Sequence, residues 1–267
     1  MISATTPVKK VAIVTGSAQG IGRAIAFRLA EDGYNICLVD LPSSSKLLEE
    51  VTQEITSKGH STSVVAVHVD VSIEKEVYAM VDKTVQTLGR VDVMVANAGI
   101  APVTPFLELS TDTLDKVYQV NVRGVFLCYQ AAAKQMIQQG EGGRLIGACS
   151  MSGLRTGANM SAYCASKFAV RAINQGAAVE LGKYGITANV YCPTVVETEM
   201  WAKIDDEISS LKGTQKGEYT EKRASLNPLG RNATPEDIAA MVSFLAGKDS
   251  SFVTGQAMQV TGGDWLS

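Results

Sequence analysis

Histidine is almost absent from this chain of 267 residues, which contains only His60 and His68. A nucleophilic hydrolase needs a histidine base beside its serine or cysteine, and zinc enzymes need clustered histidine or cysteine ligands. We expect His60, in a polar stretch, to be solvated and His68 to pack within a strand. The scarcity of histidine and the lack of a His-Glu-x-x-His motif argue against hydrolysis and against a metal site.

Cysteines at metal-binding or redox spacing are also missing. The chain has five cysteines, an odd number, and none belongs to a Cys-x-x-Cys pair. They mostly lie in apolar runs, at Cys37, Cys128, Cys149, Cys164 and Cys192. This pattern argues against a disulfide framework and against a zinc site.

The chain has no strong excess charge and no long apolar run. Its net charge is −3, so it lacks the electrostatic attraction to nucleic acid or anionic membranes that a basic protein has. No segment approaches the ~18 apolar residues of a membrane span, and the first ten residues lack the apolar core of a signal peptide. We expect a cytoplasmic protein whose partner is a small molecule, not nucleic acid or a membrane.

Short runs rich in valine and isoleucine alternate with helical patterns along the whole chain. Continuous apolar strands separated by helices are typical of a parallel sheet covered on both faces. We therefore predict one doubly wound, Rossmann-like α/β domain over residues 1–267, and the 46% of hydrophobic residues would fill one large core. The predicted strands are Val11–Thr15, Ile36–Asp40, Val64–Asp70, Val91–Asn97, Arg144–Ser150, Thr187–Pro193 and Ala257–Thr261.

A polar segment over about 200–227 interrupts this alternation after the sixth predicted strand. Long insertions in compact domains often cover a site, so we expect a lid here. Met200, Trp201 and Ile204 would form an apolar wall of the substrate pocket, and residues 205–207 an acidic shoulder. The alternative is that Trp201 packs only the lid's own core.

A glycine-rich loop follows the first predicted strand and opens the first helix. Backbone N–H groups and the helix dipole at such a position can hold a pyrophosphate, although a simple tight turn is the alternative. The spacing is Gly-x-x-x-Gly-x-Gly, and the residues we expect at the cofactor are Gly16, Gln19, Gly20, Ile21 and Gly22.

Asp40 ends the second predicted strand, where a carboxylate can accept hydrogen bonds from the adenosine ribose hydroxyls. The same charge would repel the 2′-phosphate of NADP(H), and no Lys or Arg stands at 17–19 or 41 to neutralise that phosphate. We therefore expect NAD as the cofactor. The alternative is a solvated aspartate at a strand end.

Ser150, Tyr163 and Lys167 form the sharpest chemical pattern. Tyr163 and Lys167 are four residues apart on one helical face, so the ammonium can approach the phenol and lower its pKa. Ser150, at the end of the fifth predicted strand, would hold a substrate oxygen. A Tyr and a Lys at this spacing are by themselves more often a solvated helix face.

Together these motifs resemble the short-chain dehydrogenases/reductases over essentially the whole chain. Besides the glycine loop and the Ser-Tyr-Lys set, the matching residues are Asp70-Val71, Asn97-Ala98-Gly99, Asn121, and Pro193 with Thr198. The resemblance implies hydride transfer between NAD(H) and a secondary alcohol or ketone. It also implies a homo-oligomer, commonly a tetramer.

The resemblance further implies a role for each matched residue. Tyr163 exchanges the proton, Lys167 lowers the pKa of Tyr163 and binds the nicotinamide ribose, and Ser150 orients the carbonyl. Asn121 holds a water of a proton relay. Asp70 and Val71 flank the adenine, Asn97 supports the central strand beside the cofactor, and Val196 and Thr198 bind the carboxamide. Thr194 stands where the family usually has glycine, which affects the expected backbone path beside the nicotinamide.

Within the family, four stretches resemble the acetoin/diacetyl reductases, also called 2,3-butanediol dehydrogenases: 148–150, 166–171, 191–193 and 200–205. Because loops choose substrates, other ketones stay open, among them polyols or sugars, 3-oxoacyl thioesters, steroids and secondary metabolites. A non-catalytic NAD-binding regulator is the alternative from another class. The sequence does not indicate the physiological substrate, its stereochemistry or the favoured direction.

Overall fold

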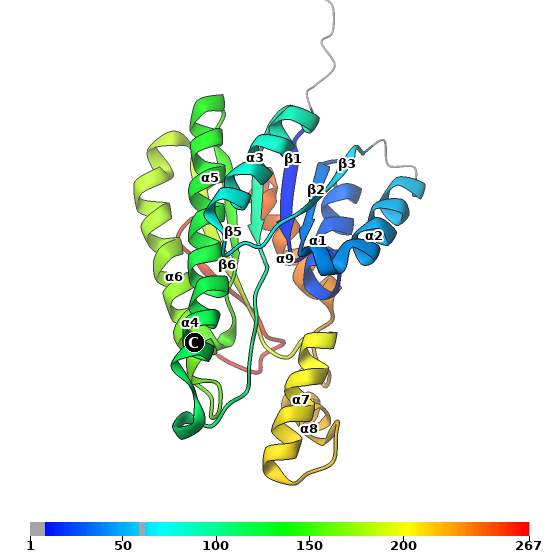
Figure 1. The fold of residues 1–267 in the computed structure, drawn as a ribbon, viewed down its shortest axis with the longest axis vertical. Helices are drawn as coiled ribbons and strands as arrows, with labels where there is room; N and C mark the ends of the chain where they lie inside the picture. Colours follow the sequence, from blue (N-terminus) through cyan, green and yellow to red (C-terminus); the bar gives the residue numbers. More distant parts are fainter. Residues whose placement is uncertain (1–8, 59–61, 267) are drawn as a thin grey trace, which may run out of the picture.

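The computed structural model describes residues 9–58 and 62–266, so His60 and the first eight residues lie outside the described part of the chain. A seven-stranded sheet with the order β3-β2-β1-β4-β5-β6-β7 forms the centre, and every neighbouring pair is parallel (Figure 1). This confirms the predicted doubly wound α/β class. The strands are β1 Val11–Thr15, β2 Asn35–Asp40, β3 Val64–His68, β4 Val93–Ala96, β5 Gly143–Ala148, β6 Ile186–Pro193 and β7 Ala257–Val260.

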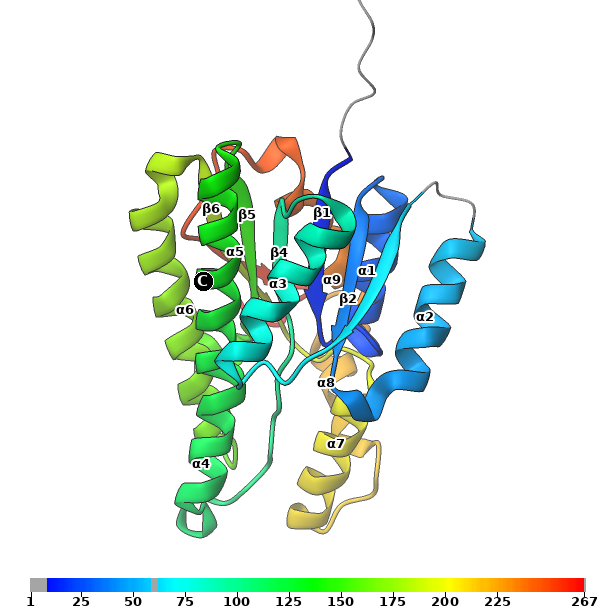
Figure 2. The same cartoon turned by 45° about the horizontal axis from the view of Figure 1, so that its top comes forward.

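Helices cover both faces of the sheet (Figure 2). On β1, Ile13 packs in one core cluster with residues of α3, α5 and α6, while Ala12 and Val14 pack in a second cluster with residues of α1, α2 and α9. Alternate strand residues therefore feed two cores, as expected for a doubly covered sheet. The helices are α1 Gly20–Glu31, α2 Ser45–Ser57, α3 Glu74–Leu88, α4 Thr111–Tyr118, α5 Gly124–Gln139, α6 Ser161–Leu181, α7 Glu199–Lys212, α8 Glu218–Leu226 and α9 Pro235–Ala246.

Four predicted strands, β3, β4, β5 and β7, are shorter in the structure than in the sequence pattern, and β3 and β4 differ most. β4 ends at Ala96 because the backbone N–H of Asn97 turns to donate to the hydroxyl of Thr15 at 2.9 Å. β3 ends at His68 and is the edge strand of the sheet. His68 is therefore exposed, and the expectation that it packs within the sheet is wrong.

The polar segment after β6 forms a helical hairpin of α7 and α8 that projects beyond the carboxyl edge of the sheet (Figures 1 and 2). It begins beside the strand ends, in the position from which a lid would act. That it closes over a ligand stays a prediction. Over residues 9–58 and 62–266, no helix combines the length and apolarity needed to cross a membrane.

Candidate active site

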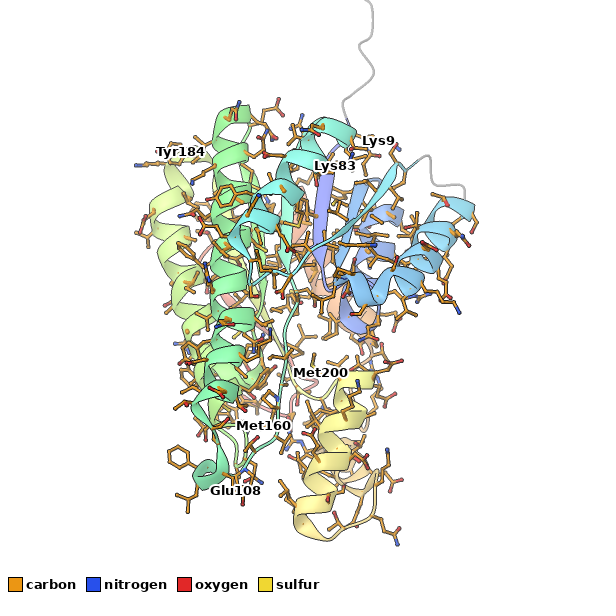
Figure 3. The ribbon with its side chains drawn as sticks, viewed as in Figure 1. Lys9, Lys83, Glu108, Met160, Tyr184 and Met200 are labelled. Atoms are coloured by element: carbon orange, nitrogen blue, oxygen red, sulfur yellow. The ribbon has the colours of Figure 1, made fainter. Side chains whose placement is uncertain are left out.

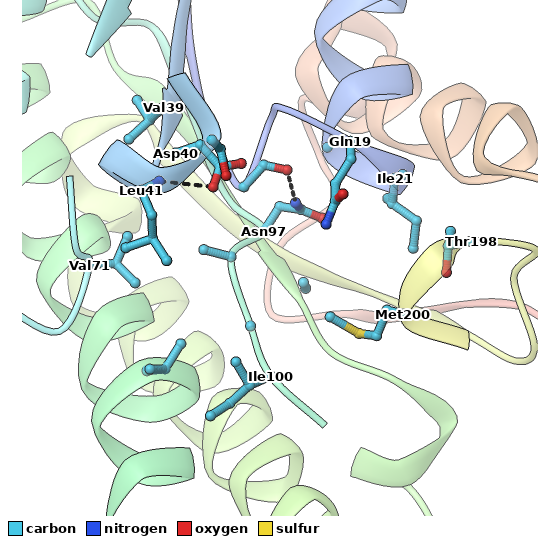
Figure 4. Close-up of a pocket in the computed structure, with 18 of the residues that line it drawn as sticks. Gln19, Ile21, Val39, Asp40, Leu41, Val71, Asn97, Ile100, Thr198 and Met200 are labelled. Atoms are coloured by element: carbon cyan, nitrogen blue, oxygen red, sulfur yellow. Dashed lines mark hydrogen bonds between the residues drawn. The ribbon is translucent and has the colours of Figure 1, made fainter. Parts of the chain in front are cut away.

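A cavity of about 380 Å³ opens at the carboxyl edge of the sheet. Its walls come from the β1–α1 loop, the ends of β2, β4, β5 and β6, and the first turns of α6 and α7. In Figure 4, Gln19, Asp40 and Met200 approach it from three different elements. Ligands of doubly wound sheets bind at this edge, so the cavity is the candidate active site.

The glycine loop is packed so tightly that side chains at its glycines would not fit. Gly16 and Gly20 are left-handed, with φ of +65° and +54°, and a β-carbon on Gly22 would lie 2.0 Å from the carbonyl oxygen of Gly16. Gln19 occupies the N-cap position of α1, and Ile21 lines the cavity with the three glycines. All five predicted loop residues therefore meet at a helix N-terminus, where N–H groups and the helix dipole suit a pyrophosphate.

Asn97 braces this loop from the neighbouring strand. Its Nδ2 donates to the carbonyl oxygens of Thr15, at 2.9 Å, and Gly16, at 3.2 Å. Its Oδ1 accepts a hydrogen bond of 2.7 Å from the hydroxyl of Tyr191 on β6. The side chain thus links β1, β4 and β6 beside the cavity, in agreement with the expected supporting position.

Asp40 lines the cavity and also holds the glycine loop. One carboxylate oxygen accepts from the N–H of Ala18 at 3.0 Å, and the other accepts from the N–H of Leu41 at 2.8 Å (Figure 4). A carboxylate can accept about four hydrogen bonds, so each oxygen retains capacity toward the cavity. This geometry suits two adjacent hydroxyls.

Asp70 and Val71 follow β3, the strand beside β2, and line the same cavity. Burial alone would raise the pKa of Asp70, but hydrogen bonds from Ser72 and the charge of Lys116 outweigh it, so the pKa is lowered. Val71 is held against α5, because a β-carbon on Gly124 would lie 2.9 Å from its Cγ2. Lys116, which the sequence analysis did not single out, lines the cavity here as well.

Tyr163 and Lys167 lie on consecutive turns of α6, and both line the cavity. The Nζ of Lys167 lies 5.5 Å from the centre of the Tyr163 ring and donates to the carbonyl oxygen of Ala148 at 2.8 Å. Ser150 follows β5, and its side chain hydrogen-bonds Tyr163. Tyr163 and Lys167 therefore line the cavity together, and Ser150 is joined to them by its hydrogen bond with Tyr163.

Burial controls the titration of this group. It lowers the pKa of Lys167 to about 8, since the charged ammonium is disfavoured away from water. Burial also raises the pKa of Tyr163 well above its ordinary value, and the hydrogen bond with Ser150 opposes this only in part. The pKa of Tyr163 is thus raised on balance, the Lys167 ammonium bonds the carbonyl of Ala148, and the expected lowering of the Tyr163 pKa by Lys167 stays a prediction.

Asn121 lies in one turn of π-helix, Gln119–Arg123, which joins α4 to α5. Its Nδ2 donates to the carbonyl oxygen of Ile100 at 2.9 Å and to the hydroxyl of Ser166 at 3.0 Å. Its Oδ1 accepts from the N–H of Ile100 at 2.9 Å. Both amide hydrogens are used inside the protein and the side chain does not line the cavity, so its contacts tie the β4–α4 connection to α6.

Thr198 and Val196 follow β6. Thr198 lines the cavity and caps α7, since its hydroxyl accepts from the N–H of Trp201 at 3.2 Å. Val196 is different, because its side chain is buried in the core and the residue does not line the cavity. Its carbonyl oxygen accepts from the Thr198 hydroxyl at 3.2 Å.

Residues 16–264 match a protein family described as enoyl-(acyl carrier protein) reductase. The chain is also 44% identical to a short-chain dehydrogenase/reductase of Armillaria gallica over 98% of each chain. The chain belongs to the short-chain dehydrogenase/reductase family. This confirms the resemblance found in the sequence and makes the protein an oxidoreductase.

Two further relatives narrow the position within the family. A protein of Staphylococcus epidermidis named diacetyl reductase [(S)-acetoin forming] is 44% identical, with 95% of this chain and 98% of the relative covered. The crystal structure of levodione reductase superposes with a TM-score of 0.88 at 33% identity, covering 95% of this chain and 96% of that chain. The predicted resemblance to diacetyl reductases is therefore confirmed.

The α7–α8 hairpin does not place Trp201 in the wall of the substrate pocket, where we had expected it. The indole Nε1 of Trp201 donates to the Thr220 hydroxyl at 2.8 Å, and its ring stacks on Tyr219 with centroids 6.0 Å apart. Asp205 is buried and accepts from the N–H groups of Gly217 and Thr220, at 2.6 and 2.9 Å. Trp201 thus packs the hairpin's own core.

The predicted acidic shoulder is wrong for the same reason. Asp205 faces inward, and Asp206 pairs with Lys216 at 3.3 Å. Glu207 accepts a hydrogen bond of 3.2 Å from the N–H of Val103, which ties the hairpin to the β4–α4 connection. Met200 does line the cavity, and Figure 3 shows it at the end of α7 that faces the sheet.

Several residues at the cavity were missed by sequence reasoning. They include Ser44, Lys116, Cys149 and Tyr191. Tyr191 had a signal, because a hydroxyl inside an otherwise apolar strand needs a partner, which here is Asn97. Lys116 had none, since a lysine on a short polar helix resembles any solvated surface residue.

Proposed function

We propose that this chain transfers hydride between NAD(H) and a compact, neutral ketone or secondary alcohol, with diacetyl, acetoin and 2,3-butanediol as its substrate class. The observation that carries the proposal is that Lys167 and Tyr163, which is hydrogen-bonded to Ser150, line the same cavity as the glycine loop. All of it lies in one catalytic domain. When bound, the nicotinamide supplies or accepts the hydride.

The glycine loop fits a dinucleotide by shape. Gly22 lies so close to Gly16 that a β-carbon would meet the Gly16 carbonyl at 2.0 Å, so only glycine allows the tight turn that directs backbone N–H groups toward a pyrophosphate. Gly16, Gln19, Gly20, Ile21 and Gly22 hold the pyrophosphate, Asp40 accepts from the adenosine ribose, and Asp70 and Val71 flank the adenine. Lys167 binds the second ribose, and Thr198 with the backbone of Val196 binds the carboxamide.

The preference for NAD over NADP rests on Asp40. The described cations that line the cavity are Lys116 and Lys167, and neither is at the Asp40 end: Lys116 acts on Asp70, and Lys167 lies beside Tyr163. A 2′-phosphate at Asp40 would meet an uncompensated carboxylate.

The protein performs the proton half of the reaction. Ser150 holds the carbonyl oxygen, and the Tyr163 hydroxyl gives that oxygen its proton when the ketone is reduced. In the reverse direction Tyr163 accepts the proton from the alcohol. Lys167 stabilises the phenolate, and Asn121 keeps the β4–α4 connection and α6 in register around it through Ile100 and Ser166.

Substrate size follows from the wall opposite this group. Ile100 and Met200 line the cavity with apolar surface, which favours a small uncharged ketone over a carrier-bound thioester. The relative named diacetyl reductase supports the same substrate class.

The test is NADH oxidation by the purified protein with a panel of diacetyl, acetoin, a sugar ketone, a steroid ketone and a 3-oxoacyl thioester. Diacetyl or acetoin should give the highest kcat/KM, and Tyr163→Phe should abolish turnover with all of them. Turnover confined to the thioester would overturn the substrate class. NADH binding without turnover of any ketone would favour the non-catalytic regulator.

The assembly and location form part of the same proposal. Phe126 on α5 and Phe168 on α6 are 45% and 40% exposed, which suits helices that pack against another copy in a homotetramer. The five unpaired cysteines suit a reducing cytoplasm. Size-exclusion chromatography with light scattering tests the tetramer, and a monomer would overturn it.

A further inference from the structure

The carboxylate of Asp264 lies where four separate segments meet. Its Oδ2 accepts a hydrogen bond of 2.6 Å from the hydroxyl of Thr194, which directly follows β6. The same oxygen accepts from Nη2 of Arg223 on α8. Nη2 of Arg155, before α6, lies 3.7 Å away. The Asp264 side chain is only 7% exposed, so this is an internal junction between the C-terminal segment and the walls of the cavity.

The charges at this junction depend on one another. A buried carboxylate is stable only when it is paired and hydrogen-bonded, and removal of one partner leaves an uncompensated charge. Arg155 is further held by Trp265, whose ring centre lies 4.4 Å from its guanidinium carbon. Asp264 and its partners therefore form one unit.

The chain around Asp264 is packed against the end of α8. A β-carbon on Gly262 would lie 2.6 Å from the side-chain oxygen of Asn227, and one on Gly263 would lie 2.9 Å from Pro228. The Nδ2 of Asn227 also donates to the carbonyl oxygen of Thr261 at 2.8 Å. The carboxylate is thus presented from a close-fitting backbone, which fixes where α8 can sit.

The junction continues into the cavity wall. Thr194 is the next residue after Pro193, which lines the cavity, and Thr198 and Met200 line it a few residues later. Arg223 belongs to the helix that packs on Trp201 through Tyr219 and Thr220. One carboxylate oxygen therefore connects both ends of the segment that forms this wall.

We propose that Asp264 is a positioning residue, and that its bonds to Thr194 and Arg223 hold the α7–α8 hairpin and the end of β6 where Met200 can form a wall of the ketone pocket. This inference rests on the proposed function. Thr194 stands where the family usually has glycine. Its hydroxyl bonds Asp264, which in turn bonds Arg223, and so links the end of β6 to the hairpin.

The test uses the pair Thr194→Val and Thr194→Ser in the full chain. Valine keeps the shape but removes the hydroxyl, whereas serine keeps the hydroxyl. Loss of a hydrogen bond to a charged group changes an equilibrium constant by about tenfold or more. Thr194→Val should therefore raise the ketone KM about tenfold. Its kcat should stay within about twofold, and Thr194→Ser should match the wild type in both.

A second readout does not need turnover. Chymotrypsin should cleave the α7–α8 hairpin faster in Thr194→Val, and in Arg223→Gln, than in wild type and Thr194→Ser. The Tm of the whole protein should change little in Thr194→Val and fall in Arg223→Gln, which removes a charged partner of Asp264. The positioning role of Asp264 can thus be tested separately from the proposed function, because the cleavage pattern is measurable even if no ketone is turned over. Hairpin cleavage and KM unchanged in Thr194→Val and Arg223→Gln would overturn the proposal. Equal effects of Val and Ser would overturn it too, since serine retains the hydroxyl.

Discussion

Lys167 holds its ammonium nitrogen 5.5 Å from the centre of the Tyr163 ring, one turn further along α6. The ammonium is almost fully buried, and it bonds the carbonyl oxygen of Ala148 at 2.8 Å. A buried lysine close to a phenol stabilises a phenolate. Its burial also lowers the free energy of unfolding, because the charged ammonium loses its hydration. The same geometry therefore predicts opposite effects on stability and on turnover.

Lys167→Met should stabilise the fold at pH 7 while it removes activity. Burial lowers the folded-state pKa of Lys167 from 10.5 to about 8, and the difference corresponds to about 3 kcal/mol. Methionine also loses the hydrogen bond to Ala148, which lowers the free energy of unfolding by about 1 kcal/mol. We therefore expect a net gain of about 2 kcal/mol in the free energy of unfolding of Lys167→Met. Urea denaturation of both proteins at pH 7 measures it.

The sign of the pH dependence gives a sharper check. Between about pH 8 and 10.5 the unfolded chain binds a proton at Lys167 that the folded chain has lost, so wild-type stability rises with pH across this window. Methionine does not titrate, and its advantage should shrink from pH 7 to pH 10. A constant difference at both values would contradict the pKa shift.

Tyr163→Phe removes only the hydroxyl, so turnover should fall by at least about 100-fold, the lower range for general acid–base catalysis. The NADH dissociation constant should hardly change, because the ring that lines the cavity is kept. Stopped-flow turnover and fluorescence titration of NADH measure the two quantities. Comparable turnover in the variant would remove Tyr163 from the mechanism.

The two directions of the reaction should differ in pH dependence. Burial raises the pKa of Tyr163, so at neutral pH the phenol carries its proton and is ready to reduce a ketone. Alcohol oxidation needs the phenolate, and its rate should rise as the pH increases. We therefore expect a higher pH optimum for oxidation than for reduction, and a shared optimum would contradict this.

Local spacing explains why much of the site could be predicted. The glycine loop and the Tyr163 and Lys167 pair depend on neighbours within a few residues, so a strand and a helix suffice to place them. The bond between Tyr191 and Asn97 joins two non-adjacent strands, and the contact of Asp264 with Thr194 joins the tail to β6. Such pairs follow from tertiary packing, which the pattern of apolar residues does not specify.

Asp205 shows how a sequence interpretation fails on an ordinary charge. It was expected in an acidic shoulder of the substrate pocket, yet it lies four residues after Trp201, on the face of α7 that packs against α8. Three hydrogen-bond donors from the α8 side satisfy it there: the Gly217 N–H and the Thr220 N–H and hydroxyl. Two of these donors are backbone groups, which every residue has. They could therefore not be predicted from the sequence without knowing where α8 packs.

Asp40→Asn should narrow or invert the preference for NADH over NADPH. Asparagine keeps one acceptor for Ala18 or Leu41, so the loop is disturbed less than by a smaller residue. Two unit charges about 4 Å apart interact by about 4 kcal/mol near a protein surface, so the ratio of kcat/KM should change at least about tenfold. Equal kcat/KM for both cofactors in the wild type would refute the assignment.

Met200 and its neighbour Trp201 should affect ketone preference differently. Met200 lines the cavity, whereas Trp201 packs on Tyr219 and bonds Thr220 inside the hairpin. Met200→Ala should therefore change the ratio of kcat/KM between small and large ketones, because it alters the pocket itself. Trp201→Ala should lower kcat/KM for every ketone by the same factor and cost about 2 kcal/mol of stability, because it removes the packing that orders the hairpin. Kinetics with diacetyl and a series of longer diketones, together with the free energy of unfolding from urea denaturation, separate the two. If Trp201→Ala changes the ratio and Met200→Ala does not, the indole contacts substrate and the hairpin must rearrange when a ketone binds.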